Sequence, residues 1–234
     1  MTRYLAILCL CSASLLSACF GLDGNGDRTR ETLDVADFVR IENNGQLDVQ
    51  VRRGEALSVV ISIDENLHNN VDVHVRDETL IIDQDAPLFD YVAGPHVLVT
   101  LPHLLFARTA GSGDLDARGF DEEETVRLET SGSGDLTFEG AAPRIEAQTE
   151  GSGDMRISGN TGFAALHTSG SGDIDARNLD ADDADLKTSG SGDIRATVHG
   201  DVDAETSGSG DVDVFGEGKL RHTREHGSGD INTH

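Results

Sequence analysis

The residues best placed to do chemistry in this sequence are seven aspartates, each of which ends a Gly-Ser-Gly-Asp tetrapeptide. They are Asp114, Asp135, Asp154, Asp173, Asp193, Asp211 and Asp230, and successive members lie 21, 19, 19, 20, 18 and 19 residues apart. A period this regular predicts a solenoid, in which stacked coils place the carboxylates about 5 Å apart. Neighbouring carboxylates at that spacing repel by roughly 0.8 kcal/mol per pair even in water.

Two arrangements could offset this repulsion. Backbone N–H groups at the corners could hold the carboxylates, or cations such as Ca²⁺ could lie along the row. In the RTX-type Ca²⁺ β-roll the aspartate stands two residues after the last glycine, whereas here it follows glycine directly and recurs once per coil. We therefore favour structural capping and predict no metal and no cofactor. Asp116, Asp175 and Asp213 add to the acidic row and keep Ca²⁺ open as an alternative.

The residues around each aspartate predict the strands that position it. An aliphatic residue always follows the aspartate, and Gly or Asn stands five residues after it in most copies, as at Gly119 and Asn178. Apolar residues two and four positions before each threonine of the repeat indicate that these threonines point inward, where the hydroxyl can reach the turn backbone. The threonines stand five residues before the aspartates, at Thr109, Thr130, Thr149, Thr168, Thr188 and Thr206. Glycine suits the corners because it allows positive φ and lets stacked corners approach closely.

The region before the repeats alternates apolar and polar residues with period two and contains several turn signals, such as Asn43-Asn44-Gly45. We expect it to begin the solenoid and to cover its first coil. The predicted fold is an all-β, single-domain parallel β-helix over residues 33–234, with coils of about 19 residues. Residues 33–105 form its N-terminal β block and residues 106–234 carry the Gly-Ser-Gly-Asp repeats.

The N-terminus predicts a lipoprotein. One basic residue precedes a short apolar run that ends in Leu16-Ser17-Ala18-Cys19, which resembles a bacterial lipobox. We predict a signal peptide over residues 1–18, lipidation of Cys19, and a flexible tether over residues 19–32. An ordinary secretory peptide cleaved nearby is the alternative. Phe20, rather than Asp, follows the cysteine, and in this the chain resembles the lipoproteins that enteric-type bacteria sort to the outer membrane. Whether the periplasmic or the surface face carries the protein stays open.

Charge and motif content bound the function. The chain has 43 acidic and 18 basic side chains and a formal net charge of −25, so nucleic acid is excluded as a partner and anionic lipid headgroups are poor ones. It contains no Gly-x-Ser-x-Gly elbow, metal-protease helix or phosphate-binding loop. The acidic residues are spread evenly over the repeats, which is typical of a scaffold. We predict that the chain is not an enzyme, with a polysaccharide-active β-helix enzyme as the weaker alternative.

The Gly-Ser-Gly-Asp-aliphatic repeats follow a β-rich lead-in that includes Phe38-Val39-Arg40-Ile41 and Leu47-Asp48-Val49. Together they resemble the putative auto-transporter adhesin, head GIN domain family, over about residues 35–234. The resemblance implies a right-handed parallel β-helix and an adhesin-like binding or structural role in the cell envelope, and it offers no catalytic residues. The expected partners are the membrane, through the lipid anchor, and an unknown protein or glycan of the envelope.

Overall fold

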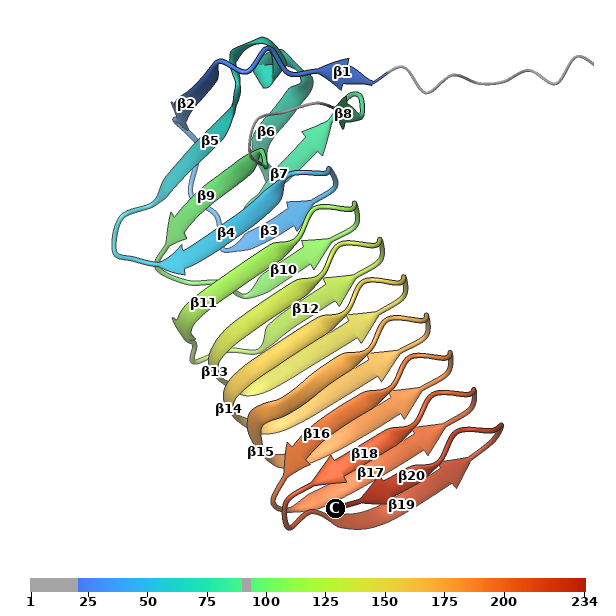
Figure 1. Cartoon of the computed structure of the whole chain (residues 1–234). Coiled ribbons are helices and arrows are strands. Elements are labelled where there is room, and N and C mark those ends of the chain that lie inside the picture. The colour runs from blue at the N-terminus through green and yellow to red at the C-terminus, as the bar shows by residue number, and fades with distance from the viewer. Residues whose placement is uncertain (1–20, 90–93) are drawn as a thin grey trace, which may run out of the picture.

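The computed structural model describes residues 21–89 and 94–234, so the predicted signal peptide and Cys19 lie outside the described residues. Figure 1 shows a stack of parallel coils with a block of strands at its N-terminal end. The chain is an all-β solenoid of about six turns, with coils about 20 residues apart. This confirms the predicted fold class, including the β-rich N-terminal cap.

Each coil contributes one strand before and one strand after its Gly-Ser-Gly-Asp corner, so the solenoid has two principal faces. The post-corner sheet contains β4 (Asp48–Arg53), β11 (Leu115–Asp121), β16 (Ile194–Val198), β18 (Val212–Phe215) and β20 (Ile231–Thr233). The pre-corner sheet contains β3 (Arg40–Asn43), β10 (Phe106–Thr109), β12 (Val126–Thr130), β17 (Asp201–Thr206) and β19 (Lys219–Glu225). Three long strands pass from the first sheet into the second: β13 (Leu136–Thr149), β14 (Met155–Thr168) and β15 (Ile174–Thr188).

The corners set the register of the stack. The aliphatic residues that follow the aspartates pair with one another from coil to coil, as in Leu136 with Met155 and Met155 with Ile174. Between coils of unequal length the register shifts elsewhere, for example between Arg156 and Ser158, where β14 pairs with β15. Extra residues are therefore accommodated away from the corner, so the corners themselves stay stacked.

The core is a narrow column between the two sheets. On the post-corner side Leu136, Met155 and Ile174 are fully buried, as the period-two alternation requires. On the pre-corner side one buried row combines leucines and alanines, as in Leu128, Ala147 and Leu166. Burial of each large aliphatic side chain contributes about 1.5–3 kcal/mol, which makes this column the main source of stability.

The N-terminal block continues the parallel stack where it adjoins the repeats, and it forms antiparallel strand pairs at its far end. The first coil, β3 and β4, pairs in parallel with β10 and β11, and the next layer, β7 (Thr79–Gln84) and β9 (His96–Leu101), pairs in parallel with β3 and β4. Beyond it, β5 (Ser58–Asp64) is antiparallel to β9 and β6 (Val71–Arg76) is antiparallel to β7. A short 3₁₀ helix over Glu65–Asn70 joins β5 to β6. The change to antiparallel pairing ends the parallel stack.

The expected flexible tether is wrong for its C-terminal part. β2 (Arg28–Leu33) pairs antiparallel with β5 over six residues, and β1 (Leu22–Asp23) pairs in parallel with β8 (Leu88–Phe89). The sequence Arg-Thr-Arg-Glu-Thr-Leu lacks an apolar alternation, and most of β2 is exposed. β2 is held in place by its backbone hydrogen bonds to β5, and a pattern of apolar side chains cannot predict such bonds.

Candidate functional site

The repeat threonines lie at the inner side of the corners. All six are buried, and their hydroxyls donate to glycine carbonyl oxygens of the corners. In four coils the acceptor lies four residues later, with Oγ1–O distances of 2.8 Å for Thr109, 3.0 Å for Thr168, and 2.9 Å for both Thr188 and Thr206. Thr130 and Thr149 reach the corner of the next coil, at 3.4 and 3.3 Å. Each hydroxyl thus satisfies a carbonyl that no strand ladder pairs.

The corner glycines are needed for close approach rather than for positive φ. Among the described corners, Gly227 is the one Gly-Ser-Gly glycine with φ in the left-handed region. A Cβ on Gly153 would overlap the carbonyl of Gly134 in the preceding coil, and the same holds at the other corners. The corner serines join the coils through their backbones, as in the 3.0 Å bond from Ser152 N–H to Gly132 C=O. The expectation that glycine lets stacked corners approach closely is therefore confirmed. The expectation of positive φ holds only at Gly227 among the described corners.

The seven aspartates form a hydrogen-bonded ladder. The Oδ1 of each of the first six accepts the backbone N–H of the aspartate one coil further on; the Asp173 N–H, for example, lies 3.0 Å from Asp154 Oδ1. The six N–H to Oδ1 distances from Asp135 to Asp230 lie between 2.8 and 3.0 Å. The carboxylates are thus held as capping groups would be. Their contribution to stability stays a prediction.

The ladder begins one coil earlier than its tetrapeptide. Asp48 Oδ1 accepts the Asp114 N–H at 3.1 Å, and Asn43 takes the place of the threonine, with its Nδ2 donating to Leu47 C=O at 2.8 Å and to Gly113 C=O at 3.3 Å. Sequence reasoning missed this rung. Its signal is the spacing: Asn43 precedes Asp48 by five residues, and Val49 follows as the aliphatic residue.

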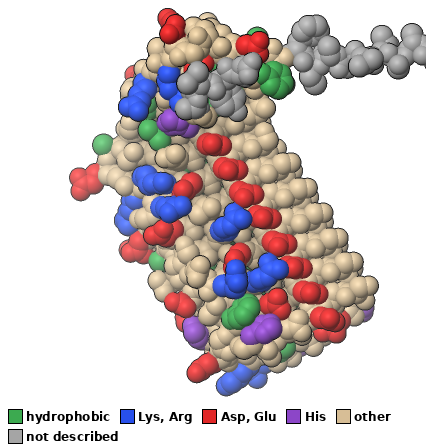
Figure 2. Space-filling view, viewed as in Figure 1, with side chains coloured by type: hydrophobic (Ala, Val, Ile, Leu, Met, Phe, Trp, Pro, Cys, Tyr) green, Lys and Arg blue, Asp and Glu red, His purple; other side chains and the backbone are tan. Residues whose placement is uncertain are grey.

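Two arginines contact the second carboxylate oxygens of the ladder. Arg156 lies 2.9 Å from Asp135 Oδ2 and 3.6 Å from Asp154 Oδ2, and Arg195 lies 3.1 Å from Asp173 Oδ2 and 2.7 Å from Asp193 Oδ2. Figure 2 shows the row of acidic side chains beside the corners, with basic side chains next to it. The hydrogen bond to Asp135 raises the pKa of Arg156. These contacts offset part of the repulsion along the row without a metal ion.

Asp175, one of the residues that kept Ca²⁺ open as an alternative, is paired in the same way. Arg177 Nη2 lies 2.6 Å from Asp175 Oδ2, and this hydrogen bond lowers the pKa of the Asp175 carboxyl. Asp116 accepts from Arg118 at 2.7 Å. The acidic row is therefore interleaved with arginines of its own strands.

A polar groove crosses the pre-corner sheet. Ala165 stands in register between Glu146 and Asp185, and its short side chain leaves a hollow between two longer ones. The hollow measures about 480 Å³ and adjoins a second one of about 260 Å³ through Asp185 and Lys187. We call the two together the pre-corner groove; besides these residues, its charged and polar lining comprises Arg127, Glu129, Gln148, His167, Asp203, Glu205, His222 and Arg224.

The charges of the pre-corner groove are paired within the sheet. Arg144 and Arg127 donate to the Glu146 carboxylate at 2.8 and 2.7 Å and hold its pKa below the usual range. Lys187 Nζ lies 2.7 Å from Asp185 Oδ2. Both signs of charge therefore face the groove at fixed positions.

Comparison with known proteins places this architecture in a family. The family described as "Putative auto-transporter adhesin, head GIN domain" matches residues 37–218. The chain belongs to this family. The match spans most of the solenoid and the N-terminal block, so the head GIN domain includes both. A search of curated proteins finds no match.

Solved structures share the fold of this head GIN domain. A putative adhesin from Bacteroides fragilis superposes with a TM-score of 0.84 at 22% identity, covering 92% of this chain and 100% of that one. A putative lipid binding protein from Parabacteroides distasonis gives 0.76 at 22% identity, with the same coverage. A putative adhesin from Parabacteroides merdae gives 0.69 at 19% identity, over 92% and 99% of the two chains. In residues 21–89 and 94–234, no helix has the length and apolar character needed to cross a bilayer.

Proposed function

We propose that this chain is a lipid-anchored protein of the bacterial cell envelope, attached to the outer membrane through Cys19, whose solenoid is a non-catalytic binding module. The family name and the names of the similar solved structures support a binding role. The observation that carries the proposal is the pre-corner groove, which crosses several coils on a rigid sheet. A side chain on such a sheet keeps its position, so the groove offers a fixed pattern of charges to a partner.

The lining of the groove selects an extended polar partner. Small-molecule sites are mostly apolar and enclosed, whereas this groove is shallow and lined by carboxylates, guanidiniums and amides. An acyl chain would remove these ion pairs from water without offering them a polar partner, which argues against a lipid tail as the ligand. The groove lining contains no Phe, Tyr or Trp on which a sugar ring could stack. A protein segment or a charged glycan with groups of both signs fits best.

A pair of matched charge reversals tests the groove. Lys187 and Arg177 each pair with an aspartate two residues earlier, at 2.7 and 2.6 Å, but Lys187 lines the groove and Arg177 lies on the post-corner sheet. The mature lipidated chain is first used to capture its partner from solubilised envelope, and the affinity is then measured by titration. Lys187→Glu should weaken binding about tenfold or more, and Arg177→Glu should leave it unchanged. Equal affinity for both variants contradicts the assignment of the groove.

The anchor is tested separately. Cys19→Ala should move the protein from the membrane fraction to the soluble fraction of the envelope. Cys9→Ala and Cys11→Ala, in the segment that the signal peptidase removes, should leave the protein on the membrane. Retention of the Cys19→Ala variant on membranes would refute lipidation while leaving the binding role untouched.

The Ca²⁺-stabilised alternative has its own measurement. The Oδ1 atoms of the ladder already accept backbone N–H groups, which supports capping without a cation. For the chain first stripped of metal ions, we expect the thermal midpoint to be the same in EDTA and in excess Ca²⁺. A midpoint that rises with Ca²⁺ in the native chain but not in Asp154→Asn would favour the cation instead.

A further inference from the structure

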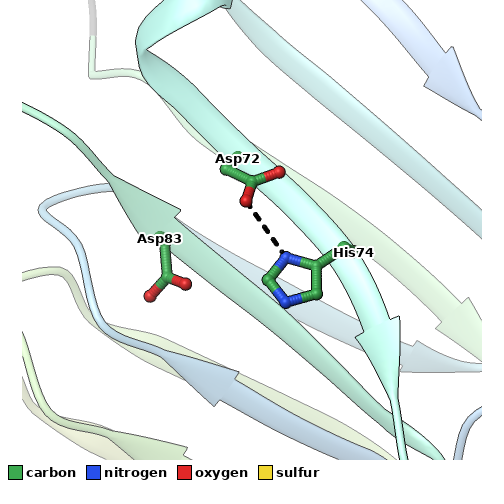
Figure 3. A group of neighbouring side chains, drawn as sticks. All are labelled: Asp72, His74 and Asp83. Atoms are coloured by element: carbon green, nitrogen blue, oxygen red, sulfur yellow. Dashed lines mark ion pairs between the residues drawn. The ribbon is translucent and has the colours of Figure 1, made fainter.

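The N-terminal cap holds a cluster of three potential metal ligands away from the ladder and the groove. Asp72 and His74 lie on β6, and Asp83 lies opposite them on β7 (Figure 3). One ligand atom from each lies within 4.8 Å of the other two. Among the described residues, no other group of three or more His, Cys, Asp and Glu side chains meets this spacing. The sequence analysis predicted no metal and did not find this cluster, because it joins two strands.

The strand pairing places like charges against each other. Asp72 and Asp83 are direct partners across the antiparallel pair, an arrangement that is destabilising for two carboxylates. His74 stands two residues after Asp72 and therefore projects from the same face of β6. A cation between the three side chains would turn this repulsion into attraction.

Two further contacts fit a metal site. The Nδ1 atom of His74 is shielded from solvent, and its 3.2 Å approach to Asp72 Oδ2 lacks hydrogen-bond geometry. The two atoms lie at ion-pair distance (Figure 3); when Nδ1 carries no proton, this nitrogen and the carboxylate oxygen are neighbouring lone-pair donors that one metal ion can bind together. Asn44 Nδ2 donates to Asp83 Oδ1 at 2.8 Å, which orients that carboxylate in the manner of an outer-shell partner.

We propose that Asp72, His74 and Asp83 bind one divalent transition-metal ion of the Zn²⁺ class. One imidazole and two carboxylates suit Zn²⁺, whereas Ca²⁺ takes six or more oxygen ligands. Three protein ligands leave at least one position of the ion for water or for a donor group of another molecule. The hairpin of β6 and β7 holds the ligands on paired strands, and the chain's net charge of −25 attracts cations to it.

Calorimetric titration of the full mature chain, stripped with EDTA, tests the site with Zn²⁺ alone as the probe. We expect one ion per chain in the native protein. Asp83→Asn and His74→Ala should each weaken Zn²⁺ binding at least about tenfold, and Asn44→Ala about tenfold. The matched control is Asp180→Asn, because Asp180 pairs with His199 at 3.6 Å without belonging to a three-ligand group. This variant should bind like the native chain.

Thermal melts recorded in EDTA show whether each variant is folded, and Co²⁺ absorption spectra report whether the imidazole is a ligand. Native-like Zn²⁺ affinity in folded Asp83→Asn and His74→Ala overturns the proposal. So does Zn²⁺ binding that is lost on Asp154→Asn, since the ion would then lie on the ladder. The site stands independently of the groove, whose test uses different residues.

Discussion

The N-terminal block and the repeats build the same corner from different residues. In the repeats a buried threonine and an aspartate flank Gly-Ser-Gly, whereas the first coil uses Asn43 and Asp48 around Asn-Gly-Gln-Leu. Both corners satisfy the same carbonyls and feed the same ladder. The two regions therefore share the hydrogen bonds of the corner. Whether a corner position is glycine depends on how closely the neighbouring coil approaches it.

Leu47 makes this difference concrete. It stands where the repeats have the second glycine. Beside this corner in the preceding layer lies Pro95, whose carbonyl oxygen accepts the Asp48 N–H at 3.3 Å and which does not belong to a Gly-Ser-Gly corner. Gly113 in turn abuts the carbonyl of Leu47, and a Cβ there would overlap it. A corner needs glycine only where a corner of the preceding coil lies against it.

The largest expected effect comes from breaking that close approach. Gly153→Ala would place a Cβ against the backbone of Gly134 in the middle of the solenoid, where the backbone cannot move away. This variant should lower the free energy of unfolding by about 3 kcal/mol. Gly94→Ala in the cap meets nothing closer than an ordinary contact to Asp48 and should change it by less than about 0.5 kcal/mol. Urea denaturation measures both. Similar stabilities for the two variants would mean that the corners can separate.

Loss of a buried side-chain donor to a corner carbonyl should have the second largest effect on stability. Thr188→Val leaves the Gly192 carbonyl without its 2.9 Å hydrogen bond and should cost about 1–2 kcal/mol in the free energy of unfolding. Asn43→Ala removes two donated bonds from the first coil and should cost about 2–3 kcal/mol. Thr137→Val, on the outward row of the post-corner sheet, is the control and should be near neutral. A larger loss for Thr188→Val than for Asn43→Ala would contradict the equivalence of the two corners.

The ladder itself gives a smaller effect that compares the two regions directly. Asp154→Ala removes the acceptor of the Asp173 N–H and should cost about 1 kcal/mol, and Asp48→Ala should cost a similar amount, although no tetrapeptide marks it. Asp154→Asn keeps an oxygen acceptor and removes one charge of the row, so its stability should stay within about 0.5 kcal/mol of the native value. Thermal and urea unfolding check these values. A large loss for Asp154→Asn would show that the charge, rather than the acceptor, matters.

The smallest effect concerns pH. Because Arg144 and Arg127 lower the pKa of Glu146, the unfolded chain binds the proton more readily than the folded chain. The stabilisation is therefore fully present above the unfolded pKa, about 4.3, and is lost as the pH falls through the lower folded pKa. Glu146→Gln should lower the unfolding midpoint slightly at pH 7, and the difference from the native chain should shrink towards pH 3. A difference that stays constant over this range would exclude the ion pairs as its cause.

The repeats could be predicted in detail, and the cap could be predicted only in outline. Seven copies of one pattern identify the inward threonines, the outward aspartates and the strand between them. Coils that differ in length by one residue accommodate the difference away from the corner, as at the register shift between Arg156 and Ser158, so the pattern around the corner is unchanged. The cap contains a single degenerate copy around Asp48, and its edge strand β2 has no apolar alternation to mark it.

The sequence by itself determined the stacking and the facing of the side chains, because a regular period and a period-two alternation act locally in every coil. Tertiary structure decided which side chains meet. The first rung joins Asp48 to Asp114 across 66 residues, the groove needs Ala165 in register between Glu146 and Asp185, and the metal-ligand cluster needs Asp72 opposite Asp83. These meetings depend on strand register between segments that are separate in the chain, which no local pattern specifies.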